Sequence, residues 1–371
     1  MSTVSHERIC AQLQAMMLIP GLCGYEGRVR RYLRAELDAL GIASRTDMLG
    51  NLIATLEGDP ALPDVMLITH MDQLGFVVRK IEADGLLRLE RVGGVPERAL
   101  AAQPVLIMVG EGRDRFGVIA NKSHHATGPE EKYRVVPYQE LYVDAGFASR
   151  DEALEAGVDV GTPVVYKPHH QQLAGNRVAG TAVDDRAGCA VQLEVLRNLK
   201  HVPNHPTIHA VFSVQEEFNL RGAQPVAETL KPAIAIQLDL VLATDTPDMG
   251  ARGDVRLGGG PAISLYSFHG RGTLNGALPH PALVALFQEE AAALDMPLQR
   301  SAHTGALTET SYVQLAGEGV AVIDIGFPCR YTHSAMEVCD TADLADLATL
   351  LVAAVGAVDS EFSLDRDDYV T

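Results

Sequence analysis

The sequence predicts an α/β protein whose mixed central sheet carries helices on both faces and is interrupted by a small, mostly β insert. Two observations carry this prediction. In the first and last parts of the chain, short apolar runs alternate with helical segments, which is typical of an α/β sheet. Between residues 74 and 166, short strands separated by glycines and polar loops replace that alternation.

The first part of the chain is expected to supply helices and then two strands. Residues 6–41 show apolar positions at helical spacing in RICAQLQAMM and VRRYLRAELDALG, with the break IPGLCGYEG between them. The short apolar runs NLIATLEG and DVMLITHMD follow and end in polar residues. They are typical of strands in a central sheet.

The insert begins with a hairpin signal. GFVVRKIEADGLLRLERVGG alternates apolar and polar residues around Asp84-Gly85, and VLIMVG, RFGVIA and TPVVYK continue the short-strand pattern. We therefore expect residues 1–73 and 167–371 to form one domain and residues 74–166 to form an inserted β domain.

The last part returns to strands alternating with helices. AGCAVQLEVLRNLK and HPALVALFQEEAAALD are expected helices, and residues 344–358 read as an amphipathic helix near the end of the chain. PTIHAVFSVQEE, PAIAIQLDL and VAVIDIGFP are expected strands.

Composition excludes several classes of function. The 371 residues carry 30 Lys+Arg against 48 Asp+Glu, a net charge of −18, which argues against nucleic acid and anionic membrane surfaces as partners. No signal peptide or membrane-spanning run is visible. The five cysteines include no C-x-x-C pair, which favours reduced thiols and a cytoplasmic location.

Acidic residues and histidines gather where strands are expected to end, which is where open α/β sheets place ligands. Taken singly, each has an ordinary explanation as a cap, a turn or a solvated strand end, and Asp245 and Asp248 compete for any role given to Asp239. Together, their oxygen and nitrogen donors suit two divalent cations. The candidates are His70, Asp72, Asp184, Glu216, Glu217, Asp239 and His333.

With these residues in hand, the chain resembles the tetrahedral, or glutamyl-type, aminopeptidase family, some of whose members are labelled CelM-like cellulases. The resemblance covers almost the whole chain and implies a zinc-exopeptidase-like fold. It rests on THMDQLGFVV, GVIANKSHHATGPEEK, GTAVDDRAGCA, SVQEEFNLRGA, IQLDLVLATDTPD and RYTHSAMEVCD, in this order.

The resemblance implies a role for each candidate. His70 and Asp239 would bind one metal, Glu217 and His333 the other, and Asp184 would bridge the two. Glu216 would be the general base and Asp72 would orient His70. The two ions are expected to be Zn²⁺, with Co²⁺ or Mn²⁺ as alternatives, and the substrates to be peptides with a free N-terminus. The insert, β-barrel-like in this family, implies a homo-oligomer between a dimer and a dodecamer.

Three departures from the family pattern bear on substrate choice. Gln73 stands where Glu is frequent, Gly259 stands where Lys is frequent, and Glu309 lies in Leu307-Thr308-Glu309-Thr310 where the family has G-T-D-A. We expect the last two segments to lie around the substrate. Deacylation of a non-peptide amide and a catalytically inactive, metal-binding relative therefore remain open. A carboxylate-pair glycosidase is the least favoured alternative, because the adjacent residues Glu216 and Glu217 would point to opposite faces of their expected strand.

Overall fold

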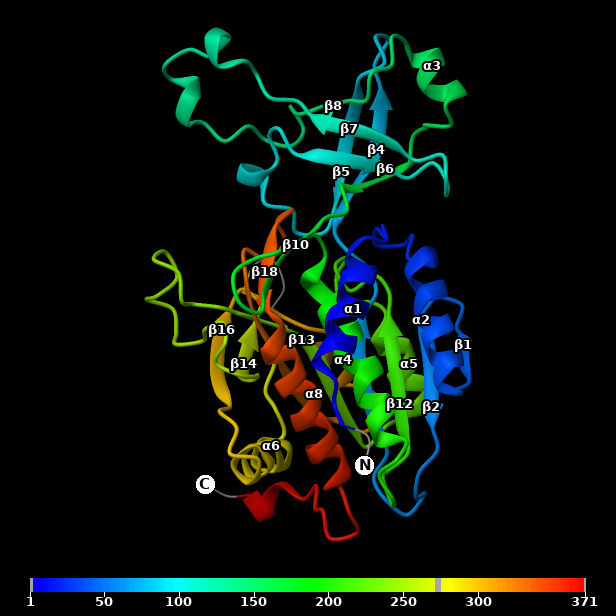
Figure 1. Cartoon of the computed structure of the whole chain (residues 1–371), viewed down its shortest axis with the longest axis vertical. Coiled ribbons are helices and arrows are strands. Elements are labelled where there is room, and N and C mark those ends of the chain that lie inside the picture. The colour runs from blue at the N-terminus through cyan, green and yellow to red at the C-terminus, as the bar shows by residue number, and fades with distance from the viewer. Residues whose placement is uncertain (1–2, 271–274, 370–371) are drawn as a thin grey trace.

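A computed structural model describes residues 3–270 and 275–369 and confirms the expected α/β architecture (Figure 1). Within these residues, twelve strands form one mixed sheet and six others close into a barrel. Figure 1 shows the barrel at one end of the molecule and both chain termini toward the opposite end. No helix of the described residues is long and apolar enough to cross a membrane.

The strands of the mixed sheet come from both sides of the insert. They are β1 (Ser44–Thr46), β2 (Leu52–Leu56), β3 (Val65–His70), β10 (His170–Gln172), β11 (Arg177–Gly180), β12 (Ile208–Ser213), β13 (Ile234–Leu242), β14 (Ala262–Phe268), β15 (Gly276–Ala277), β16 (Gln299–Thr304), β17 (Ala321–Arg330) and β18 (Glu337–Asp340). Their order is β1-β2-β12-β3-β13-β17-β18-β11-β10, with β14 to β16 joined beside β17. Strands β12, β3, β13 and β17 are parallel, so their carboxyl ends meet at one edge.

Helices cover both faces of this sheet. One face carries α1 (His6–Met17), α2 (Gly27–Leu40), α4 (Val183–Leu199), α6 (Pro281–Ala293) and α8 (Thr341–Gly356). The other face carries α5 (Ala223–Leu230) and α7 (Thr310–Val313). Helix α4 packs against the sheet and is covered by α1 and α8, which is why nearly every one of its residues is buried.

The barrel has a hydrophobic core of its own. Its strands are β4 (Gly75–Ile81), β5 (Leu87–Val92), β6 (Pro104–Ile107), β7 (Arg115–Ile119), β8 (Val143–Asp144) and β9 (Pro163–Tyr166), closed in the order β4-β5-β8-β7-β6-β9. The expected hairpin turns at Gly85, and the short helix α3 (Arg150–Glu155) packs on the same core. The domain boundaries at 73/74 and 166/167 remain a prediction.

Candidate metal centre

The candidate residues meet at the carboxyl edge of the parallel strands. His70 is the last residue of β3, and Asp239 lies in the second half of β13. Asp184 stands at the start of α4, directly after β11, and His333 lies in the connection between β17 and β18. The sheet thus joins residues that lie far apart in the sequence.

Asp184 stands between the two histidines. Its Oδ1 lies 2.9 Å from His70 Nε2, and its Oδ2 lies 3.6 Å from His333 Nε2. Two groups of donor atoms, each within 4.8 Å of one another, share this carboxylate: His70, Asp184 and Asp239 form one, and Asp184, Glu217 and His333 form the other. One carboxylate therefore presents an oxygen to each of two neighbouring positions.

The second histidine is held from three sides. His333 Nε2 lies 3.5 Å from Glu217 Oε2, and its Nδ1 lies 3.0 Å from the carbonyl oxygen of Gly94. Its backbone N–H donates to Glu337 at 2.7 Å, and the same carboxylate accepts the N–H of Asp184 at 3.1 Å. A ring nitrogen facing a carbonyl fixes which nitrogen is free to act as a ligand. Sequence reasoning missed Glu337, which opens the short strand β18 and has no apolar run before it to mark it as the end of a strand.

The adjacent glutamates lie beyond the strand that was expected to contain them. Strand β12 ends at Ser213, and Gln215 adopts a φ of +57°, which turns the backbone before Glu216. Both Glu216 and Glu217 consequently line the same cleft. The expectation that they point to opposite faces of a strand, which weighed against a glycosidase, is therefore wrong.

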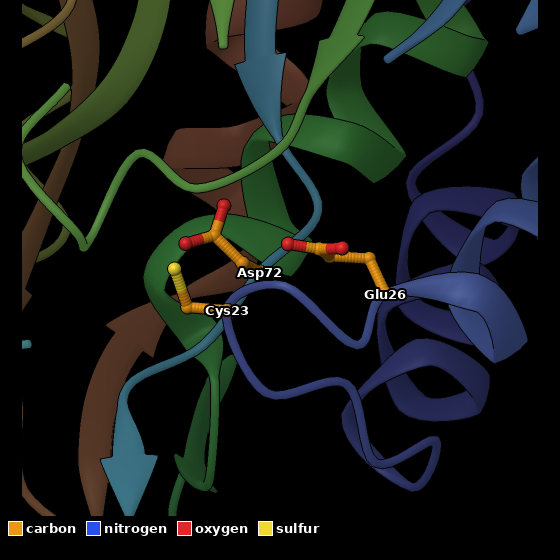
Figure 2. Close-up of side chains that lie close together, drawn as sticks. All are labelled: Cys23, Glu26 and Asp72. Atoms are coloured by element: carbon orange, nitrogen blue, oxygen red, sulfur yellow. The ribbon is translucent and has the colours of Figure 1, made fainter. Parts of the chain in front are cut away.

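Asp72 supports both halves of the site. Its backbone carbonyl oxygen lies 3.2 Å from His70 Nδ1, and its Oδ1 lies 3.7 Å from the same nitrogen. Its two carboxylate oxygens accept the backbone N–H groups of Glu216 and Glu217, each at 3.1 Å. Figure 2 shows Cys23 and Glu26 beside it, and the donor atoms of these three buried residues lie within 4.8 Å of one another. Burial and the Asp72 charge raise the pKa of the Cys23 thiol, so this thiol stays protonated.

The cluster of Cys23, Glu26 and Asp72 differs in charge from the two donor groups that share Asp184. The guanidinium of Arg186 is fully buried and interacts electrostatically with Asp72 and Glu26. This permanent cation therefore offsets one of the two carboxylate charges. Cys23, Glu26 and Arg186 are therefore suited to holding Asp72 in place.

The main site concentrates negative charge. Burial raises the pKa of Glu217 to about 7, with the neighbouring Asp184 adding to the effect. Burial, together with the charge of Asp184, raises the pKa of Asp239 well above its usual value, and burial does the same for Glu216. Burial opposes ionisation of Asp184 itself, but the hydrogen bond with His70 lowers its pKa. These buried carboxylates lack a positive charge that would stabilise their ionised form. A bound cation would supply that charge, so the site favours cations.

The competing acids take other roles. Asp245 pairs with Arg330 at 2.6 Å, and Asp248 accepts a hydrogen bond from Thr246. Of the three acids that could have joined the site, only Asp239 belongs to a group of donors.

A cleft of about 650 Å³ opens over the site. Asp184, Glu216, Glu217, Asp239 and His333 line it, while His70 and Asp72 lie behind this lining. The connection before α7 contributes Leu307 and Thr308 to this lining.

The other departures from the family pattern do not line the cleft within the described residues. Gly259 lies in a turn whose neighbouring N–H groups donate to Asp343. Glu309 is fully buried and accepts hydrogen bonds from Ser213 Oγ and Ala223 N. Gln73 accepts the N–H of Gly21 at 3.1 Å. All three have structural roles, and the expectation that the Gly259 turn borders the substrate remains a prediction.

Comparison with known proteins gives the family. The M42 glutamyl aminopeptidase family matches residues 50–350. A lysyl aminopeptidase from Pyrococcus furiosus is 32% identical over 326 residues, which cover 86% of this chain and 89% of that protein.

Solved structures agree over nearly the full length. The aminopeptidase APDkam598 from Desulfurococcus kamchatkensis has a TM-score of 0.89 at 29% identity, covering 99% of this chain and 98% of that chain. The TET1 peptidase of Pyrococcus horikoshii, which can assemble into a tetrahedron or a large octahedral shell, has a TM-score of 0.82 at 28% identity, covering 94% and 99%. The chain belongs to the M42 glutamyl aminopeptidase family, enzymes that hydrolyse peptide bonds.

Proposed function

We propose that the protein is a dinuclear metal-dependent aminopeptidase. His70 and Asp239 would bind one divalent cation, Glu217 and His333 the other, and Asp184 would bridge them. The observation that carries this proposal is the position of Asp184, whose carboxylate belongs to both donor groups and faces one histidine with each oxygen. The nitrogen and oxygen donors suit Zn²⁺, and Co²⁺ or Mn²⁺ are alternatives.

Charge supports two cations. Two divalent cations carry four positive charges. Asp184, Glu217 and Asp239 supply three negative charges, and Glu216 supplies the fourth negative charge. Two cations held there would acidify a water molecule and polarise the scissile carbonyl group.

The chain's own residues would move the proton and hold the geometry. Glu216 would take the proton from the attacking water and pass it to the leaving amine, a role typically worth ~10²–10⁴-fold in rate. Asp72 orients His70 and also holds the backbone N–H groups of Glu216 and Glu217. The base and two ligands therefore share one positioning carboxylate.

The test of these roles compares Glu216→Gln with Glu217→Gln. Glu216→Gln should retain two metal ions per chain, measured by elemental analysis, and lose most turnover. Glu217→Gln should lose metal from one site. A Glu216→Gln enzyme with near-normal turnover would overturn the assignment of the base.

Peptides with a free N-terminus are the proposed substrates. The protein should release residues stepwise from free N-termini in a mixed peptide pool, but not from N-acetylated peptides, and only when loaded with Zn²⁺ or Co²⁺. Mass spectrometry of the products identifies both the activity and the preferred residue. Metal-loaded protein that cleaves none of these peptides would instead favour a non-peptide amide or an inactive relative.

The barrel between residues 74 and 166 is the proposed oligomerisation domain. Its surface exposes apolar side chains that a monomer would leave in water: Phe116 is 63% exposed, Tyr133 93% and Val135 50%. The shells formed by the TET1 peptidase of Pyrococcus horikoshii support an assembly between a dimer and a dodecamer. A strictly monomeric mass by light scattering would contradict this proposal.

A cytoplasmic location is proposed on the cysteines. All five, Cys10, Cys23, Cys189, Cys329 and Cys339, are free thiols. Free thiols are typical of a reducing compartment. Recovery of the activity in the soluble fraction of a lysate, with all five thiols titratable after unfolding, tests this.

A further inference from the structure

A small side pocket opens beside the candidate metal centre. Its volume is about 40 Å³, enough for about three water molecules or a terminal group of similar size. Asp239 stands at its border with the main cleft. Its apolar walls include Leu240 and Leu307, and its polar side chains are the carboxylates of Asp239 and Asp324, the imidazole of His303 and several hydroxyl groups, among them that of Ser267.

Strand geometry directs Asp324 into the space next to Asp239. In the parallel pair of β13 and β17, Asp239 lies opposite Gly326, and Asp324 is two residues earlier on β17. Side chains two residues apart in a strand share a face, so Asp239 and Asp324 point to the same side of the sheet. The strand spacings put their Cα atoms about 8 Å apart.

The Asp324 carboxylate is buried and incompletely partnered. Its Oδ1 accepts hydrogen bonds from Thr308 at 2.9 Å and Thr310 at 2.6 Å, and both donors are neutral. Neither of these hydrogen bonds reaches its Oδ2. Burial raises the pKa of Asp324 to about 6. A buried carboxylate of this kind is stabilised by a charged hydrogen-bond donor.

A second polar group in the pocket also lacks a partner. Ser267 is only 7% exposed, and its Oγ forms no hydrogen bond within the described chain. A hydroxyl oxygen can accept a hydrogen bond as readily as donate one. Asp324 Oδ2 and Ser267 Oγ together provide acceptors for a group that carries several N–H donors.

We propose that this side pocket receives the amine-bearing side chain of the substrate's N-terminal residue, of the lysine or ornithine type, with Asp324 as the residue that determines this specificity. The inference rests on the proposed function, because it requires the reacting peptide bond to lie beside Asp239. The aliphatic stem of such a side chain would pass Leu240 and Leu307, and its ammonium group would offer three donors to Asp324 and Ser267.

The competing candidate is an acidic side chain bound by Arg252. Arg252 lines the main cleft, but it is exposed and donates to the backbone oxygen of Thr304 at 3.3 Å. Solvent screens an exposed charge, which weakens its discrimination between substrates relative to a buried one. The side pocket is therefore favoured over Arg252 as the determinant of preference.

The test measures kcat/KM for the p-nitroanilides of lysine, ornithine, norleucine and glutamate. Norleucine keeps the stem of lysine and lacks the amine. The wild-type enzyme should prefer lysine and ornithine over norleucine, and Asp324→Asn should lower kcat/KM for lysine about 10- to 100-fold. Norleucine should stay within about threefold, which also shows that the variant is folded. Asp248→Asn, which removes an equal charge from an exposed position outside the cleft, is the matched control.

The outcomes separate the two proposals. A lysine-to-norleucine ratio that Asp324→Asn leaves unchanged, or a preference for glutamate, overturns the side-pocket inference while the aminopeptidase stands. If neither protein cleaves any substrate, the proposed function fails, and calorimetry still tests the pocket. L-lysine amide should then bind wild type more tightly than L-norleucine amide does, and Asp324→Asn should abolish that difference. Equal binding overturns the inference.

Discussion

Replacing Glu309 with Gln should make the protein more stable at pH 8 and leave its stability nearly unchanged at pH 4.5. The wild-type carboxylate is fully buried between Ser213 Oγ and Ala223 N. A glutamine in the same place can accept the Ala223 N–H with its oxygen and donate to Ser213 Oγ with its amide. Glu309→Gln thus imitates the protonated acid with almost the same shape.

The magnitude follows from the shift in pKa. Burial raises the pKa of Glu309 from 4.5 to about 7 in the folded protein. Because the folded value lies above the unfolded one, the stabilisation is fully present below pH 4.5 and is lost as the pH rises through 7. A rise in pKa from 4.5 to about 7 corresponds to about 3 kcal/mol. The free energy of unfolding of wild type should therefore fall by about that amount relative to Glu309→Gln across this interval.

Urea denaturation of both proteins, at equal protein concentration and several pH values between 4.5 and 8, measures the difference. Other titrating groups occur in both proteins, so their contributions cancel in the comparison. A difference that does not change with pH would refute the reasoning. So would a glutamine variant that is less stable at pH 8. Turnover should change little, since Glu309 lies outside the lining of the cleft.

Three further outcomes are expected. Glu337→Gln should weaken metal binding ~10- to 100-fold, measured by chelator competition, because Glu337 holds the backbone N–H groups of both Asp184 and His333. Gly58→Ala should lower stability by ~1–3 kcal/mol in urea denaturation, because the added Cβ would meet the His205 carbonyl oxygen at 2.3 Å, whereas the control Gly27→Ala has only side-chain atoms 3.6 Å away and should not destabilise. Removal of the metal should lower the midpoint temperature of thermal unfolding. Added Zn²⁺ at ~100 times its Kd should raise the free energy of unfolding by about 2.7 kcal/mol, and an unchanged midpoint would count against the ligand set.

Local patterns were sufficient to predict the architecture. Helical spacing predicted α1 and α2, and the apolar runs predicted β3, β12 and β13 because a buried strand needs apolar residues on both faces. The same patterns located the candidate ligands, since a polar residue that ends an apolar run marks the edge of the sheet. His70 and Asp239 were found in this way.

Features that depend on backbone torsion or on distant pairing could not be predicted. The positive φ of Gln215 carries Glu216 and Glu217 out of the strand, and no residue pattern announces it. Asp324 was hidden inside the apolar run VAVIDIGFP, and only its register beside β13 relates it to Asp239. Glu309 was expected near the substrate because its segment stands where the family has G-T-D-A. The one-residue step along the chain from Thr308 turns the Glu309 side chain into the interior instead.

The contact between His333 and Gly94 ties the barrel to the chemistry. Gly94 follows the second barrel strand, yet its carbonyl oxygen orients the ring of a candidate ligand carried by the main sheet. Excising the barrel and joining residues 73 and 167 with a short linker would remove the proposed assembly surface. It would also remove the carbonyl oxygen that orients the His333 ring. The insert and the larger part of the chain form one functional unit, so evolutionary exchange of the barrel has to preserve the path of residues 93–96.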